Sequence, residues 1–248
     1  MAQSANNVNM AGRALLANVA LCIGALKKAE SRPRPLPGMV VFYGPSGFGK
    51  STAAAVTVTQ TGAYYVQAQS SWTRKATHLS ILKAMGISPA KTIYEMSEQI
   101  ATQLVLSKRA LIIDEADYLV DRGQIEIVRD LYEASQAAIM LIGEENLPIK
   151  LKRYERFHGR VLDFVPAQPA SFDDAKALRG LYAKEVSIAD DLLALVHEQA
   201  RGSARRICVN LELIKDVALK GGREEMDAAA WGDRPLYTGE APARRVPI

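Results

Sequence analysis

The sequence predicts an α/β fold in which a parallel sheet of five strands is covered by helices on both faces. Short apolar runs without polar alternation have the composition of buried strands, at residues 39–43, 63–66, 110–113, 138–142 and 161–164. Stretches with helical spacing separate or follow these runs, at residues 51–59, 77–85, 94–107, 124–135 and 147–157. Strands that are apolar throughout and alternate with helices are typical of a sheet buried on both faces.

A further helix is expected ahead of the first strand. Residues 11–29 carry apolar side chains at helical spacing, and a proline-rich segment at 32–38 ends the pattern. Residues 1–10 are polar, which predicts a flexible N-terminus.

The strand pattern stops after Phe164, and three helices are expected between residues 171 and 219. The first two begin with the spacing of N-terminal caps, and a Gly-Ser pair introduces the third. The residues concerned are Ser171 with Asp174, Ser187 with Asp190, and Gly202 with Ser203.

From residue 221 onward the composition shifts to Gly, Pro, Ala and charged residues, which predicts a disordered tail containing a lone Trp231. The chain is therefore divided into a flexible N-terminus (1–10), an α/β domain with its N-terminal helix (11–165), a helical lid (166–220) and a tail (221–248).

The overall composition excludes several classes of protein. Apolar residues make up 48% and charged residues 23% of the 248 residues, which argues against a fibrous, disordered or disulfide-stapled chain. The net charge of +4 is too small to indicate a nucleic-acid binder by itself. Cys22 and Cys208 lie in apolar helical contexts without CxxC spacing, so we expect reduced core thiols.

The segment that most resembles a targeting signal is the apolar run 14–26. It is too short to span a bilayer, and charged residues rather than a cleavage site follow it. We therefore expect a cytoplasmic protein without a membrane partner.

A phosphate-binding motif of the form G-x-x-x-x-G-K-[ST] lies between the first predicted strand and the helix that follows it. Its residues are Gly44, Pro45, Ser46, Gly47, Phe48, Gly49, Lys50 and Ser51. Glycines allow the backbone to wrap a phosphate chain, and the helix contributes its positive end. Lys50 is expected to contact the β and γ phosphates of ATP, and Ser51 is expected to bind Mg²⁺. Thr52 is placed near the α phosphate.

The second half of this site follows the strand 110–113. Asp114 stands at the strand tip, where a Walker B carboxylate is placed to bind Mg²⁺. Glu115 comes directly after it and is suited to orient the attacking water, which indicates hydrolysis of ATP rather than storage. Asp117 is expected to be a helix cap or a surface charge.

These residues resemble the AAA+ ATPases, over about residues 11–219. The resemblance implies a P-loop AAA+ fold with a small C-terminal helical lid. It also implies that Arg205, with Arg206 as the alternative, is the sensor 2 arginine of the lid. The sensor 1 position falls on Glu144, although Asn146 is the chemically easier choice because a second carboxylate near the γ phosphate is repulsive.

The family places an arginine finger ahead of the fifth strand, where this chain has five basic residues between 150 and 160. A finger that reaches the nucleotide of a neighbouring subunit typically contributes about 10³ to 10⁵ in rate. Arg156 is the first choice and Arg153 or Arg160 the alternatives, while a solvated basic surface is about equally compatible with the sequence.

Within this family the chain resembles transposition target-selection ATPases of the phage Mu B type, the Tn7-type regulator ATPases and ExeA. The resemblance rests on the short N-terminal helix, the Leu-Ile-Ile-Asp-Glu-Ala-Asp segment, Leu-Ile-Gly before a basic helix, and the tail segment 236–242 followed by Arg244-Arg245. It implies an ATPase, encoded by a phage or transposon, that oligomerises as a helical filament on duplex DNA without sequence preference. Such a protein delivers target DNA to a transposase and disassembles on hydrolysis.

DNA contact is expected from the ATPase module, because 43 residues ahead of Gly44 leave no room for a helix-turn-helix domain. The candidate residues follow the second predicted strand and are Trp72, Thr73, Arg74 and Lys75. A polar loop with Trp72 packed on the core is equally compatible with the sequence. The alternative functions are an ExeA-like assembly or secretion-associated ATPase and a helicase-loader-type ATPase.

Overall fold

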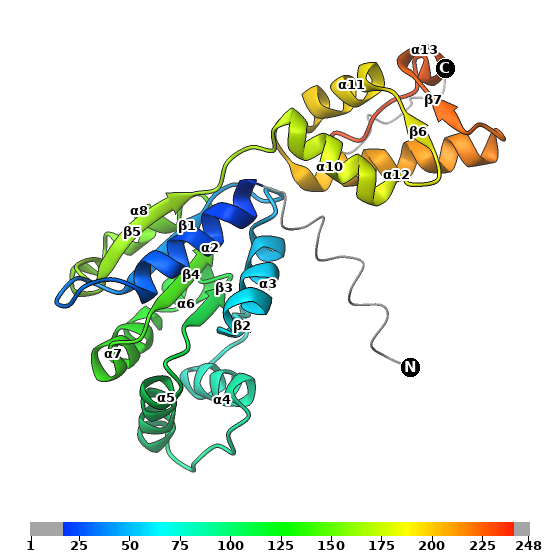
Figure 1. Ribbon diagram of the computed structural model, residues 1–248. Helices are drawn as coiled ribbons and strands as arrows, with labels where there is room; N and C mark the ends of the chain where they lie inside the picture. The colour runs from blue at the N-terminus through cyan, green and yellow to red at the C-terminus, as the bar shows by residue number, and fades with distance from the viewer. Residues whose placement is uncertain (1–16, 241–248) are drawn as a thin grey trace, which may run out of the picture. The chain divides into compact units, whose positions relative to one another are not determined.

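The computed structural model describes residues 17–240, which form two compact units (Figure 1). The first unit contains residues 18–46 and 50–167, and the second contains residue 17, residues 47–49 and residues 168–240. None of the helices in this described part of the chain is long and apolar enough to cross a membrane.

A five-stranded parallel sheet forms the centre of the first unit within residues 17–240. Its strands are β1 (Met39–Tyr43), β2 (Tyr64–Gln67), β3 (Leu111–Asp114), β4 (Ile139–Gly143) and β5 (Val161–Pro166). They lie side by side in the order β2-β3-β4-β1-β5. The strands β1, β3 and β4 are buried along most or all of their length, and β2 is buried at two of its four residues. This confirms the predicted α/β fold and places the five apolar runs to within a few residues.

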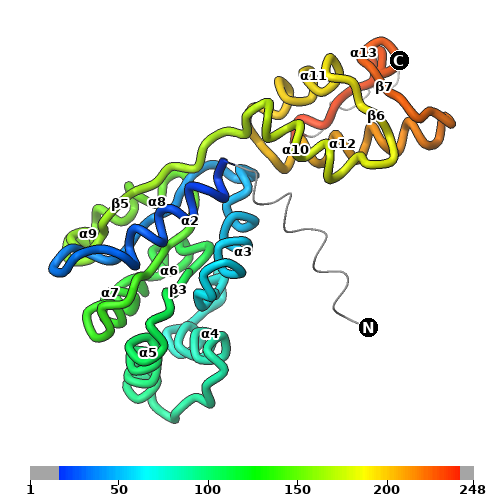
Figure 2. The backbone as a smooth tube through the Cα atoms, in the orientation of Figure 1, coloured from blue at the N-terminus to red at the C-terminus, as the bar shows by residue number. Residues whose placement is uncertain are grey.

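One helix precedes the first strand of this sheet, and the other helices of the unit lie between strands along the chain (Figure 1). They are α2 (Ala17–Glu30), α3 (Lys50–Thr61), α4 (Arg74–Met85), α5 (Ile93–Ser107), α6 (Asp117–Asp121), α7 (Ile125–Ser135), α8 (Leu147–Leu151) and α9 (Glu155–His158). The helices α4 and α5 pack against each other after β2, as Figure 2 shows.

Two local predictions for this unit were wrong. The expected helix 147–157 is divided into α8 and α9, because Tyr154 adopts a non-helical conformation (φ −110°, ψ 75°) and donates a hydrogen bond from its hydroxyl to the Val120 carbonyl. The short helix α6 was not expected, since it contains only five residues. It has too few positions to show a helical period.

The second unit has a helical core and a small sheet. Its helices are α10 (Phe172–Tyr182), α11 (Asp190–Ala200), α12 (Ala204–Lys220) and α13 (Ala228–Trp231), and its strands are β6 (Ser187–Ile188) and β7 (Glu225–Met226). Ser171 and Asp174 form the predicted capping box, and Ser203 caps α12 as predicted. Ser187 is not a cap, because it lies in β6 and pairs with β7 while Ala189 precedes α11.

The described part of the predicted tail, residues 221–240, is packed on this core, which corrects the expectation of disorder there. The side chain of Trp231 is 2% exposed, and its indole N–H donates a hydrogen bond to the Arg234 carbonyl (2.9 Å). The Asn210 side chain bonds both the N–H and the carbonyl of Tyr237. Burial of the large indole side chain stabilises the folded tail, although the polar composition of the segment predicted disorder. Arg244 and Arg245 lie outside the described residues.

Cys22 and Cys208 are both free, but Cys208 is half-buried, so the expectation of a core thiol holds for Cys22 and not for Cys208. Cys22 is buried, and burial raises the pKa of its thiol to about 11. Its sulfur lies 3.6 Å from that of Met140 in β4, so it fills the interface between α2 and the sheet.

Arg32 joins the segment ahead of β1 to two helix ends. Its guanidinium donates hydrogen bonds to the carbonyls of Ala29 (2.7 Å), Gln136 (2.7 Å) and Leu36 (3.1 Å). Since the first two carbonyls lie at the ends of α2 and α7, the side chain satisfies acceptors that the helices leave open.

We predict that Arg32→Ala lowers the free energy of unfolding by about 1–3 kcal/mol, because charge-assisted hydrogen bonds to helix-end carbonyls are removed. Chemical denaturation of the full chain measures this change. Arg34→Ala is the matched control, since Arg34 is exposed in the same segment. Equal unfolding free energies for the two variants would contradict the role of Arg32.

Candidate functional site

The predicted phosphate-binding segment forms a loop between the end of β1 and the start of α3. Gly47 (φ +86°) and Gly49 (φ +79°) adopt left-handed conformations that suit glycine and turn the backbone sharply. At the start of the loop, the Gly44 N–H donates a hydrogen bond to the Gly143 carbonyl (3.3 Å). The loop is therefore anchored at the end of the neighbouring strand β4.

Lys50 is the first residue of α3, and its ammonium group points back into this loop. Its Nζ donates hydrogen bonds to the carbonyls of Gly44 (2.7 Å) and Pro45 (2.9 Å). Burial lowers the pKa of Lys50, while four nearby carboxylates, first among them Glu115, oppose that change. The cation thus stands between the phosphate-binding loop and a group of acidic side chains.

The remaining residues of the motif differ in exposure. Ser51 and Thr52 lie in the first turn of α3, with Ser51 exposed and Thr52 half-buried. Pro45 and Phe48 are half-buried and Ser46 is exposed. The first turn of a helix leaves several backbone N–H groups without intrahelical partners, so this end of α3 is suited to an anion.

Asp114 is the last residue of β3, and its side chain is almost completely buried. One carboxylate oxygen accepts a hydrogen bond from the Tyr65 hydroxyl (3.0 Å), and the other accepts one from the Glu115 N–H (2.9 Å). A carboxylate has about four lone-pair sites, so both oxygens retain capacity to bind a cation. Tyr65 was not predicted as a site residue, because a tyrosine in a strand carries no sign of the carboxylate it contacts.

Glu115 adopts a left-handed backbone conformation (φ +54°), which is unusual for a residue other than glycine. Such conformations are strained and persist where the surrounding structure enforces them. Burial raises the pKa of the Glu115 carboxyl, as does the charge of Asp114, whereas Lys50 acts in the opposite direction. The strand end therefore turns sharply at the residue expected to orient water.

Glu144, the residue at the predicted sensor position, directly follows β4. Its backbone N–H donates a hydrogen bond to Asp117 Oδ2 (2.7 Å). Asp117 was expected to be a cap or a surface charge, and this was wrong: it is 5% exposed and is the first helical residue of α6, after Ala116. Asn146 precedes α8 and makes no capping hydrogen bond from its side chain among the described residues.

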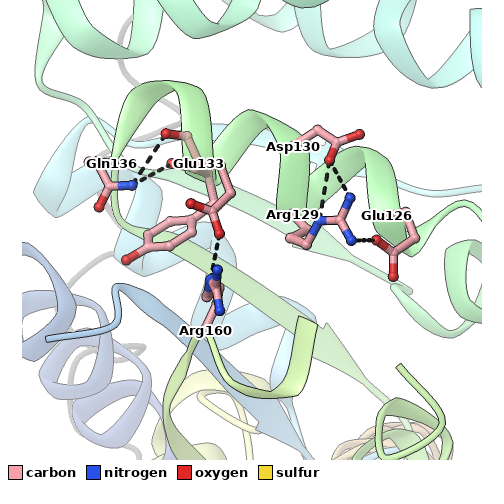
Figure 3. Close-up of polar contacts among 7 residues, drawn as sticks. Glu126, Arg129, Asp130, Glu133, Gln136 and Arg160 are labelled. Atoms are coloured by element: carbon pink, nitrogen blue, oxygen red, sulfur yellow. Dashed lines mark hydrogen bonds and ion pairs between the residues drawn. The ribbon is translucent and has the colours of Figure 1, made fainter. Parts of the chain in front are cut away.

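The basic residues between 150 and 160 fall into two groups. Lys150 forms ion pairs with Asp117 and Asp121, and Arg160 pairs with Glu133 of α7, as Figure 3 shows for the arginine. Arg153 and Arg156 lie on the segment between them. The Arg160–Glu133 pair is exposed to solvent on both sides, so water screens it and it does not distinguish Arg160 from Arg153 and Arg156 as a candidate finger.

The predicted sensor 2 arginine, Arg205, lies in the first turn of α12 in the second unit and is exposed. Its backbone N–H donates a hydrogen bond to the carbonyl of Gly47, which belongs to the same unit (3.1 Å). Arg206 follows it and is half-buried.

The predicted DNA-binding residues have different surroundings. Trp72 packs against the core of the first unit, and its carbonyl accepts a hydrogen bond from the Gln124 side chain (2.8 Å). Thr73 caps α4. Arg74 and Lys75 are at the surface in the first turn of that helix, with Arg74 exposed. Trp72 is thus partly buried against the core, whereas the Arg74 and Lys75 side chains are both exposed.

These residues fit a nucleoside triphosphate with Mg²⁺. Gly47 and Gly49 provide the turns, Lys50 and the first turn of α3 provide positive groups, and Asp114 provides a buried carboxylate with free lone pairs. Ser51 and Asp114 are the residues suited to hold the metal ion, since Mg²⁺ prefers oxygen ligands and is usually shared with phosphates.

Residues 35–151 match a protein-family model described as an AAA domain. No curated protein sequence matches the chain.

Several solved structures are similar to the fold of this chain. The Orc1 protein of Aeropyrum pernix, determined in complex with DNA, has a TM-score of 0.63 and 18% identity, with 86% of this chain and 62% of that chain covered. Cdc6p of Pyrobaculum aerophilum has a TM-score of 0.59 and 16% identity, with coverages of 84% and 62%. Domain III of the Thermotoga maritima replication initiation protein DnaA has a TM-score of 0.56 and 18% identity, with coverages of 86% and 88%. The chain thus spans less than two thirds of the first two proteins.

The charges around Glu115 can be tested in solution. We predict that Lys50→Met raises the pKa of Glu115 further, because the lysine is the cation that opposes the rise. Carboxyl-carbon NMR titration of the full chain measures this pKa. Lys83→Met, which removes an exposed lysine from the last turn of α4, is the control. A Glu115 pKa that falls or stays constant in Lys50→Met would show that the two groups are not coupled.

Proposed function

We propose that this chain, whose residues 35–151 match the AAA domain, binds ATP with Mg²⁺ and hydrolyses it. The observation that carries this proposal is the arrangement of Lys50 in the loop after β1 and the Asp114-Glu115 pair after β3. Both strands run parallel in one sheet, so their carboxyl ends share an edge. A phosphate-binding cation and a metal-binding carboxylate are thereby placed at the same edge.

The loop residues bind the phosphate chain in this proposal. Backbone N–H groups of Gly47, Gly49 and the first turn of α3 contact the phosphates, and Lys50 exchanges its carbonyl partners for β and γ phosphate oxygens. Ser51 and Asp114 would hold Mg²⁺, and the ion would supply positive charge beside the phosphates.

Glu115 orients the water that attacks the γ phosphate and accepts its proton. A carboxyl whose pKa is raised toward neutrality is a better base than an ordinary one, and burial provides that shift. The left-handed backbone of Glu115 departs from the extended conformation of β3 at the residue after Asp114. The two adjacent carboxylates can then serve different roles.

Additional residues complete the site in an assembled state. Arg156 is proposed as the finger that contacts the nucleotide of a neighbouring subunit, with Arg153 or Arg160 as the alternatives, since all three lie between α8 and β5. Arg205 is proposed as the lid arginine. Glu144 is proposed to sense the γ phosphate, with Asn146 as the alternative.

The proposed partner is duplex DNA, bound through phosphates without sequence preference by an ATP-dependent oligomer or filament that presents DNA to a transposase. Two observations support the DNA part of this proposal: the surface pair Arg74 and Lys75, and the similarity of the fold to Orc1, whose structure contains DNA. In a filament, each protomer needs only a few cations because contacts sum along the DNA.

A second candidate function is that of an assembly ATPase or helicase loader that acts on a protein. Exposed apolar side chains on α5 favour it, since Tyr94 is 74% and Leu106 is 73% exposed. Such side chains would support protein binding if they belong to one contiguous apolar patch.

Two substitutions separate nucleotide binding from hydrolysis. We predict that Lys50→Ala weakens ATP binding by about 10- to 150-fold, which corresponds to removing a charge-assisted hydrogen bond of about 1.5–3 kcal/mol. Glu115→Gln should keep ATP affinity, reduce turnover by about 10² to 10⁴-fold and prolong the assembled state. Fluorescent-nucleotide binding, phosphate release and sedimentation measure the three quantities. An active Glu115→Gln variant would show that another residue orients the water.

The DNA proposal predicts filaments that require both duplex DNA and a non-hydrolysable ATP analogue, observed by sedimentation and electron microscopy. Replacing Arg74 and Lys75 with alanine should weaken DNA binding and reduce the slope of log affinity against log salt by about 2, because each cation neutralises one phosphate. Lys83→Ala, at the other end of α4, is the matched control. Nucleotide-dependent oligomers that are indifferent to DNA would favour the second candidate function.

A further inference from the structure

Asp117 lies where three parts of the first unit meet. It begins α6, two residues after Glu115, and its side chain is 7% exposed. Oδ2 accepts a hydrogen bond from the Glu144 N–H (2.7 Å), and Oδ1 lies 3.0 Å from Lys150 Nζ. One buried carboxylate therefore connects the end of β3, the end of β4 and helix α8.

The neighbourhood of Gly143 is shaped around this carboxylate. A Cβ atom at Gly143 would lie 2.3 Å from Asp117 Oδ2 and 2.5 Å from Leu147 Cδ2, which excludes any other residue there without movement. The Gly143 carbonyl accepts the hydrogen bond from Gly44 N–H. The same strand end thus contacts the phosphate-binding loop on one side and Asp117 on the other.

Lys150 extends the connection toward the arginines of the following segment. It is one residue from the end of α8, and the chain continues directly into Arg153 and, in α9, Arg156. Its second partner, Asp121 Oδ2, lies 2.9 Å away, but the side chain of Asp121 is 53% exposed. The pair with buried Asp117 is therefore the stronger of the two, because water screens the other.

From these contacts we infer that Asp117 is a positioning residue that couples the nucleotide site to the arginine-bearing segment 147–158. Its hydrogen bond fixes the backbone at Glu144, and its ion pair fixes α8, so displacement of the Glu144 backbone also displaces α8. The inference rests on the proposed function in one respect: the event that alters segment 147–158 is the binding of nucleotide near Lys50 and Glu144.

Three variants divide this connection into its parts. Asp117→Ala removes both interactions, and Lys150→Met removes only the ion pair. Asp121→Asn is the matched control, since it removes the exposed partner of Lys150 and leaves Asp117 intact. A fourth variant, Lys150→Arg, restores a cation at the same position.

The first measurement is amide hydrogen exchange of Glu144 in the full chain without nucleotide. Exchange should accelerate by about tenfold or more in Asp117→Ala, because the hydrogen bond to a charged acceptor is removed. It should be unchanged in Lys150→Met and Asp121→Asn. Equal protection of Glu144 in Asp117→Ala and in the unmodified chain would overturn the inference.

The second measurement compares exchange across residues 147–158 with and without a non-hydrolysable ATP analogue. The unmodified chain, Asp121→Asn and Lys150→Arg should show a nucleotide-dependent change, whereas Lys150→Met should bind the analogue within about threefold of the normal affinity and lose that change. Transmission that persists in Lys150→Met would overturn the inference, even where Asp117→Ala fails to fold. An unmodified chain that binds no nucleotide would instead overturn the proposed function, and the first measurement would still decide whether Asp117 holds Glu144.

Discussion

The parallel pairing of β1 with β4 and of β4 with β3 is the constraint on which the candidate site depends. Parallel strands end at one edge of the sheet, so Tyr43, Gly143 and Asp114 finish close to one another. Everything assigned to nucleotide chemistry in the first unit begins within a few residues of those ends. The hydrogen bond from Gly44 N–H to the Gly143 carbonyl then fixes the loop after β1 to the end of β4.

The sheet and the motif residues were predictable because they depend on local patterns. An apolar run of four or five residues specifies a buried strand, and the motif from Gly44 to Ser51 specifies its loop through two glycines that adopt positive φ angles. Partners far apart in the sequence were not predictable. Tyr65 and Asp114 are 49 residues apart, and Asp117 and Glu144 are 27 apart, so their pairing depends on strand order and register. Similarly, the burial of Trp231 in the core of the second unit depends on tertiary contacts, which cannot be predicted from amino-acid composition.

The prediction for Asp117 failed for a reason that applies to many charged residues near a motif. A carboxylate that closely follows the end of a strand is predicted from sequence to be exposed, because burial of a charge is costly unless partners compensate. Here Lys150 and the Glu144 N–H provide that compensation, and both come from segments later in the chain. The ion pair of Arg160 with Glu133 was likewise not predictable, because the sequence around Arg160 does not distinguish it from the neighbouring basic residues.

Charge balance explains why an acidic residue is compatible with the position of Glu144. Four carboxylates, from Asp114, Glu115, Asp117 and Glu144, act on Lys50. Lys150 neutralises Asp117, so the repulsion that Asp117 would otherwise add is reduced. The other acidic groups act on one half-buried cation, Lys50, and the phosphates of ATP would add further negative charge. Under the proposed function, Mg²⁺ held by Asp114 and Ser51 would supply positive charge beyond that of Lys50.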